Sequence, residues 1–97
     1  MPTYITLYKL TEQGIKKIKN APQRVEAAIK AFEAAGGKMK GFYATMGEYD
    51  YVTIGELPSD ENHMAFILGL GSAGNVRTTT LRAFTEKEFA AIVKKLP

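Results

Sequence analysis

The chain has 97 residues, of which 45% are hydrophobic, a formal net charge of +3 and no cysteine. This length fits one domain over residues 1–97, and the lack of cysteine excludes disulfides, thiolate metal sites and cysteine nucleophiles. Basic residues are interleaved with acidic ones, which argues against nucleic-acid binding. No apolar run reaches the roughly 20 residues of a membrane span, and the first residues do not resemble a signal peptide. We therefore expect a soluble cytoplasmic protein that binds neither membranes nor nucleic acid.

The first predicted elements are a strand and two helices. Residues 4–10 are rich in β-branched and aromatic side chains with polar groups at alternate positions, as in a half-buried strand. Thr11 is placed to cap a helix. An apolar stripe at helical spacing follows and is interrupted at Pro22, which should begin a second helix. Asn20 and Gln23 have the spacing of a capping box at that restart.

A hairpin is predicted in the middle of the chain. Gly36 and Gly37 should end the second helix, since glycine adopts the left-handed conformation that helix ends need. Residues 38–46 form the next predicted strand, in which Gly41 indicates either a bulge or the close approach of another backbone segment. Gly47 begins the turn, and the strand over residues 49–57 returns alongside its neighbour.

The second half again reads helix, then strand. A helix is predicted from residue 60 to about residue 70. The segment 69–74 matches the letters G-x-G-x-x-G, but it closes a helix and precedes a strand, so we reject a dinucleotide site. Residues 75–84 form the fourth strand. Thr85 and Glu88 then make a capping box for a C-terminal helix with an apolar face.

Alternation along the strands divides the sheet into two faces. We expect the helices to cover the face that carries Ile5, Leu7, Val52 and Ile54. The open face should then carry Thr6, Tyr8, Tyr51 and Thr53. In the helix over residues 60–70 the inward stripe is predicted to be Met64, Ile67, Leu68 and Gly71, with Phe66 and Leu70 on the opposite side next to His63.

The order of elements predicts a ferredoxin-like α+β fold, βαββαβ, with a four-stranded antiparallel sheet, helices on one face and an extra C-terminal helix. An uncovered sheet face with several tyrosines on so small a domain calls for a partner. A second copy of the same sheet is the most economical partner, because a two-fold interface is self-complementary. We therefore expect a homodimer or a higher homo-oligomer.

Several short motifs are spread over nearly the whole chain: Tyr4-Ile5, Thr11-Glu12-Gln13-Gly14-Ile15, Ala35-Gly36-Gly37, Gly47-Glu48-Tyr49-Asp50, Gly71 to Asn75-Val76-Arg77-Thr78, and Leu81-Arg82-Ala83-Phe84. In these motifs the chain resembles the GYD domain family, whose members are small bacterial and archaeal proteins of undetermined function. The family is named after a signature of glycine, tyrosine and aspartate, and Glu48 separates the glycine from the tyrosine here, as in the longer form of that signature. The resemblance implies a dimeric α/β barrel, an architecture shared with antibiotic-biosynthesis-type monooxygenases, muconolactone-isomerase-like enzymes, stress-responsive barrel proteins and haem-binding dismutases.

Two residues are candidates for acid–base chemistry. Asp50 has the alternation of Val52 and Ile54, so we place it on the helix-facing side. It either bonds backbone amides around the Gly47 turn or pairs with an arginine, or it acts as a general base at a cavity mouth. His63 is the only histidine. It lies near a helix N-terminus, where the helix dipole disfavours its cation, and no co-ligand set for a metal or haem accompanies it.

The candidate ligand-binding residues are aromatic and basic. Arg77 and Arg82 have opposite alternation on one strand, so at most one faces the barrel interior, where it could bind a carboxylate or another anion. The alternative for both is a salt bridge. Tyrosine rings are candidate ligand contacts, with ordinary packing as their alternative. These tyrosines are Tyr8, Tyr49 and Tyr51.

Three functions remain open from the residues. The first is a homo-oligomeric barrel that binds a small apolar or anionic molecule without catalysis, and we expect it because no matched acid–base pair is evident. The second is a cofactor-free enzyme of the monooxygenase or isomerase kind. The third is a purely structural assembly protein. We expect no cofactor and no metal in any of them.

Overall fold

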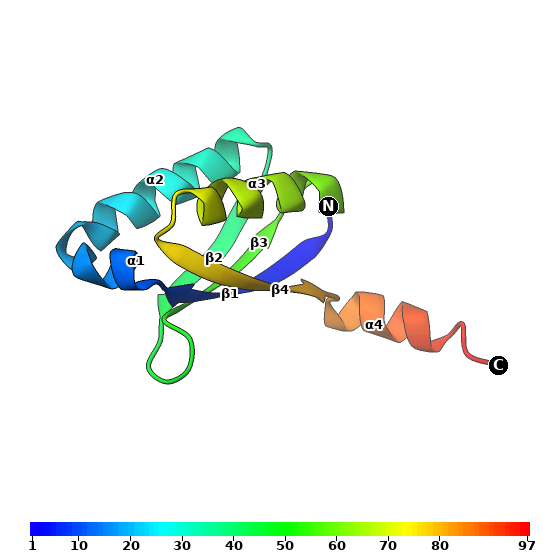
Figure 1. The fold of residues 1–97 in the computed structure, drawn as a ribbon. Coiled ribbons are helices and arrows are strands. Elements are labelled where there is room, and N and C mark those ends of the chain that lie inside the picture. Colours follow the sequence, from blue (N-terminus) through cyan, green and yellow to red (C-terminus); the bar gives the residue numbers. More distant parts are fainter.

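The computed structural model describes residues 1–97 and contains four strands and four α-helices (Figure 1). The order is that predicted from the sequence, with the ends of several elements shifted by one to three residues. The elements are β1 (Thr3–Leu10), α1 (Glu12–Lys16), a 3-10 turn (Ile18–Asn20), α2 (Ala21–Ala34), β2 (Lys38–Ala44), β3 (Tyr51–Glu56), α3 (Asp60–Ser72), β4 (Val76–Ala83) and α4 (Glu86–Val93).

The strands form one antiparallel sheet in the order β2-β3-β1-β4. Both α2 and α3 lie on the same side of this sheet, and the other side is uncovered (Figure 1). This is the ferredoxin-like α+β fold expected from the alternation of elements. The sheet register shifts between Met39 and Gly41 on β2, which confirms the bulge predicted at that glycine.

Local signals account for most of the element ends. The side chains of Thr11, Ser59 and Thr85 each accept a hydrogen bond from a backbone N–H in the first turn of α1, α3 and α4. Gly36 has a φ of 91°, as the left-handed end of α2 requires. The capping box predicted at Asn20 is wrong. Its side chain makes no capping bond, because a 3-10 turn leads directly into α2 and its backbone is not extended.

The assignment of the two sheet faces made from the sequence is inverted. Thr6 is 2% exposed and lies under the helices, whereas Ile54 is 36% exposed on the uncovered side. Tyr8 and Thr53 are likewise buried, and Tyr51 lines the space beneath the helices with them. The reason is that both faces carry apolar groups, so alternation separates the faces without saying which one the helices cover.

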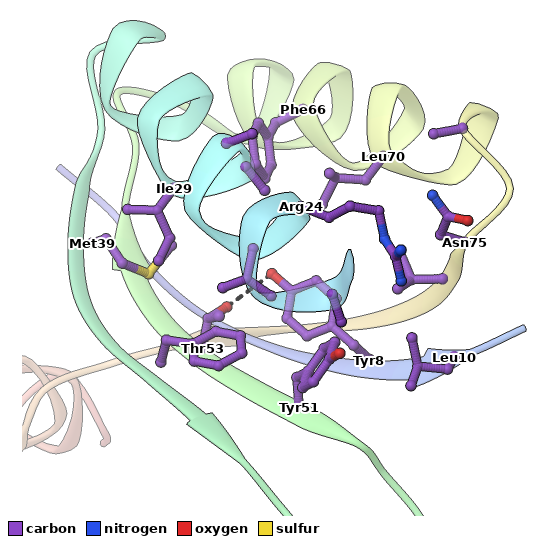
Figure 2. Close-up of a pocket in the computed structure, with 17 residues that line it drawn as sticks. Tyr8, Leu10, Arg24, Ile29, Met39, Tyr51, Thr53, Phe66, Leu70 and Asn75 are labelled. Carbon is purple, nitrogen blue, oxygen red and sulfur yellow. Dashed lines mark hydrogen bonds between the residues drawn. The ribbon is translucent and has the colours of Figure 1, made fainter. Parts of the chain in front are cut away.

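The same inversion applies to α3. Phe66 packs against the buried cluster of Tyr4, Phe32 and Leu57, and Leu70 also points inward (Figure 2). His63 is buried on this side too, while Met64 and Leu68 are exposed. Apolar residues occupy both sides of this helix, so the hydrophobic pattern does not show which side faces the sheet.

The C-terminal helix α4 extends away from the sheet and the other helices (Figure 1). Its apolar residues, Phe89, Ile92 and Val93, are exposed. The capping box of Thr85 and Glu88 predicted from the sequence is present. No helix of the chain combines the length and the apolar character needed to cross a membrane.

Candidate functional site

A cavity of about 370 Å³ lies between α2, α3 and the helix-covered face of the sheet (Figure 2). Short side chains on α2 contribute to it, because Ala21, Ala27 and Ala28 line the cavity where longer residues would occupy more of the space. The volume is at the lower end of the range of about 300–1,000 Å³ found for small-molecule sites. Of the 17 residues that line the cavity, 14 are hydrophobic.

All four strands contribute to the floor of the cavity, and its polar side chains come from β1 and β3. The hydroxyl groups of Tyr8 and Thr53 lie 3.0 Å apart and are hydrogen-bonded to each other. Burial raises the pKa of the Tyr8 phenol, so this group stays protonated at neutral pH. The ring of Tyr51 lies 5.2 Å from that of Phe42, centroid to centroid. The polar groups of Tyr8 and Thr53 thus satisfy each other and leave a mainly apolar surface for a ligand.

Arg24 is the only charged residue that lines the cavity. Its guanidinium donates to the carbonyl oxygens of Lys17 at 2.8 Å and Gly14 at 3.2 Å, near the end of α1. No carboxylate lies within salt-bridge distance of it, since the ion pairs of the chain are Lys9–Glu48, Lys16–Glu12 and Lys30–Glu26.

Of the predicted ligand-binding residues, Tyr8 and Tyr51 line this cavity, and the other three lie outside it. Tyr49 lies in the β2–β3 loop, with the Lys9 ammonium 5.4 Å from its ring centre. Arg77 pairs with Lys9 and Arg82 with Tyr4 in the sheet register, so the two arginines lie on opposite faces as predicted. Arg82 stacks over the ring of Phe84 at 4.6 Å and donates to backbone carbonyls. Neither arginine reaches the cavity.

Asp50 has a visible structural role. Its Oδ2 accepts a hydrogen bond from the Leu10 backbone N–H at 2.8 Å, and its own N–H donates to the Tyr8 carbonyl at 2.8 Å. These two bonds tie the end of the β2–β3 loop to the end of β1. The residue bonds a backbone amide, as one of the sequence alternatives predicted, but the amide belongs to β1 and not to the Gly47 turn. Asp50 precedes β3, so its predicted position on the helix-facing side stays a prediction.

Replacing Asp50 with alanine is expected to lower the free energy of unfolding by about 1–3 kcal/mol, because the part-buried Leu10 N–H loses its acceptor. Asp50→Asn keeps a side-chain oxygen and should cost less. Urea denaturation of the two variants measures the difference. Glu48→Ala in the same loop is the control, since it removes only an exposed ion pair worth about 0–1 kcal/mol. Equal stability of wild type and Asp50→Ala would contradict this role.

His63 is buried between α3 and the sheet, outside the cavity. Its Nε2 lies 2.9 Å from the Thr80 hydroxyl, and its ring stacks on Tyr4 with centroids 4.2 Å apart. The Nδ1 atom is buried without a hydrogen-bond partner. Burial, and then a hydrogen bond donated to Asp60, raises the pKa of Tyr4 to about 12. Burial lowers the pKa of His63, and the Asp60 carboxylate opposes that change only in part.

The stability of the protein should therefore fall as the pH drops below about 6.5, the ordinary pKa of histidine. In that range the unfolded chain takes up a proton on His63 that the folded chain, with its lowered pKa, does not bind, so protonation favours unfolding. Urea denaturation between pH 7.5 and pH 5 in wild type and His63→Gln measures the effect. In His63→Gln the free energy of unfolding should lose this part of its pH dependence, which corresponds to the uptake of at most one proton on unfolding. Identical pH dependence in both proteins would contradict the prediction.

The sequence reasoning did not single out Arg24 as a site residue. A signal was available, because Arg24 precedes Val25 and lies one helical turn before Ala28, which places it at the border of the apolar stripe of α2. The sequence pattern predicts Asn75 only as the start of a strand. In the structure it lines the cavity at the end where Arg24 lies (Figure 2). No cluster of three or more histidine, aspartate or glutamate side chains could hold a metal ion.

The fold and the cavity together define the class of protein: a ferredoxin-like α+β protein with a mainly apolar cavity between its helices and its sheet. The chain belongs to the GYD domain family, because the model of that family matches residues 4–93. This match confirms the resemblance drawn from the sequence motifs.

Two relatives share nearly the whole chain. One is a protein of Thermus thermophilus named glutamine synthetase and cystathionine beta-lyase binding protein. The chain is 32% identical to it over 95 residues, which are 97% of this chain and 100% of the relative. The other is the crystal structure of TTHA0845, also from Thermus thermophilus. It has a TM-score of 0.56 and 26% identity, and the alignment covers 88% of this chain and 95% of that chain.

Proposed function

We propose that this protein is a homodimeric, non-catalytic binding protein that holds a small, mainly apolar molecule in the cavity between α2, α3 and the sheet. The observation that carries the proposal is the cavity itself: about 370 Å³, lined by 14 hydrophobic residues out of 17. The two predicted acid–base residues support a binding role over a catalytic one, because neither Asp50 nor His63 lines it.

The uncovered sheet face supports the dimer. Apolar side chains occupy it from edge to edge, with Tyr43 on β2, Ile54 on β3 and Leu81 on β4 all exposed. Ile5 lies directly between Ile54 and Leu81 in the register. A continuous apolar face of this kind is unfavourable in water, and a second copy offers a matching face by two-fold symmetry. The dimer expected from the sequence would therefore form through the sheet face that carries Ile5 and Leu7.

Binding of 1-octanol, an uncharged apolar probe, tests the cavity. Isothermal titration calorimetry should show binding to the wild-type protein and none to Ala28→Leu, in which the added side chain fills the cavity. Ala31→Leu is the matched control, because Ala31 is exposed on the same helix and does not line the cavity. Absence of binding to wild type, or equal binding to both variants, would overturn the proposal. Native mass spectrometry of the purified protein adds the assembly state and any retained ligand.

A second candidate function is binding to another enzyme. The name of the 32% identical relative supports it, since that name describes a binding protein for glutamine synthetase and cystathionine beta-lyase and the similarity extends over the full relative. The test is biolayer interferometry with these two purified enzymes from the organism that supplies this chain. Binding to neither enzyme at micromolar concentration would exclude this function.

A further inference from the structure

We infer that the molecule held in the cavity is an amphipathic monocarboxylate, whose carboxylate is bound by Arg24 and whose apolar body lies against the aromatic floor. This inference rests on the proposed small-molecule binding and specifies the chemical class of the ligand.

The charge of the residues that line the cavity is not balanced. Arg24 brings one positive charge, and no aspartate or glutamate is among the lining residues. The carbonyl oxygens of Gly14 and Lys17 hold the guanidinium in place, but they are dipoles without net charge. The cation is therefore uncompensated at the edge of an apolar space. An anion there is attracted more strongly than in water, because the effective dielectric constant is lower.

Arg24 and Asn75 have hydrogen-bond donors that are left for a ligand. A guanidinium has five N–H donors, and the two carbonyl bonds leave others for a ligand. The Oδ1 of Asn75 accepts from Gln13 at 2.9 Å, so its side-chain nitrogen is the group left to donate. Both residues thus offer donors. A carboxylate, which only accepts, matches this end, and its planar geometry suits the fork of an arginine.

The two ends of the cavity differ in polarity. Figure 2 shows Arg24 and Asn75 at one end and Met39 at the other. Between them, Tyr8 and Thr53 bond each other and offer little to a polar ligand. A ligand with one charged end and an apolar body of aliphatic or aromatic character fits this arrangement. A dianion does not, because the cavity provides a single cation.

Octanoate and 1-octanol, which share the same apolar chain, test the inference. Isothermal titration calorimetry at pH 7.5, where the carboxylate is ionised, should give a Kd for octanoate that is roughly tenfold or more below that for octanol. Arg24→Gln should remove this preference, because it weakens the binding of octanoate much more than the binding of octanol. Arg24→Lys keeps the charge without the fork and should retain part of the preference. Lys30→Gln, which removes one charge from the exposed side of α2, should change neither Kd.

The outcomes separate the two proposals. Equal affinity of wild type for both probes would overturn the carboxylate inference and leave the binding function intact. A parallel loss of both probes in Arg24→Gln would also overturn it, because Arg24 would then act only by supporting α1. Binding of neither probe to wild type would overturn the inference together with the proposed function. The wild-type comparison decides the ligand class even if Arg24→Gln fails to fold.

Discussion

Replacing Phe32 with alanine is expected to lower the free energy of unfolding by about 3–5 kcal/mol. Phe32 is 3% exposed, and its ring packs edge-on against Phe66 with centroids 5.1 Å apart. It also fills the space over Gly37 and Gly55, where an added Cβ would meet the ring at 2.6 Å and 2.8 Å. Because these two positions lack side chains, they contribute nothing that could fill the gap left by the ring. Chemical denaturation at fixed protein concentration measures the loss.

Phe89→Ala is the matched control for this variant. It makes the same chemical change on α4, where the ring is exposed, and should shift the free energy of unfolding by only about 0.5 kcal/mol. The expected loss for Phe32 is a large part of the roughly 5–15 kcal/mol that stabilises a typical domain. A loss of less than about 1 kcal/mol would show that the buried cluster of Tyr4, Phe32 and Leu57 is not the centre of the core.

Replacing Leu81 with aspartate is expected to dissociate the proposed dimer, raising its Kd by roughly 10,000-fold or more. Leu81 lies on the uncovered sheet face opposite Ile5 and is 47% exposed within one chain. The substitution therefore costs little in the monomer. In a two-fold interface it would bury two unpaired carboxylates, at a cost of about 3–5 kcal/mol for each buried unpaired charge. Sedimentation velocity over a range of concentrations measures the change.

Met46→Asp is the control for the added charge. Met46 is 99% exposed in the β2–β3 loop, so the same substitution there should leave assembly unchanged. A wild-type protein that sediments as a 10.7-kDa monomer at micromolar concentration would remove the argument for the paired sheets. So would a Leu81→Asp variant that assembles as well as wild type.

The order of elements could be predicted from the sequence because the signals that delimit them are local. A capping side chain such as Thr11 or Thr85 and a left-handed glycine such as Gly36 act within one turn of the chain. The bulge at Gly41 followed from the same kind of information. These features require no knowledge of what the element packs against.

The packing sides could not be predicted, because they depend on contacts between distant residues. In β1, Leu7 and Tyr8 are both suitable for a core, and only the position of α2 and α3 makes Tyr8 the buried one. In α3 the same ambiguity holds for Leu68 and Leu70. The cavity is formed jointly by alanines of α2 and residues of the sheet that are distant in the sequence, so neither its existence nor the role of Arg24 could be predicted from local patterns.

The strand β1 lies in the interior of the sheet, between β3 and β4, and its side chains alternate between the two proposed binding surfaces. Tyr8 contributes to the cavity, and its neighbour Leu7 points to the uncovered face. Adjacent residues of β1 thus belong to the two different surfaces that we propose for ligand binding and self-association. A substitution at one of these positions would therefore alter one proposed surface and leave the other in place.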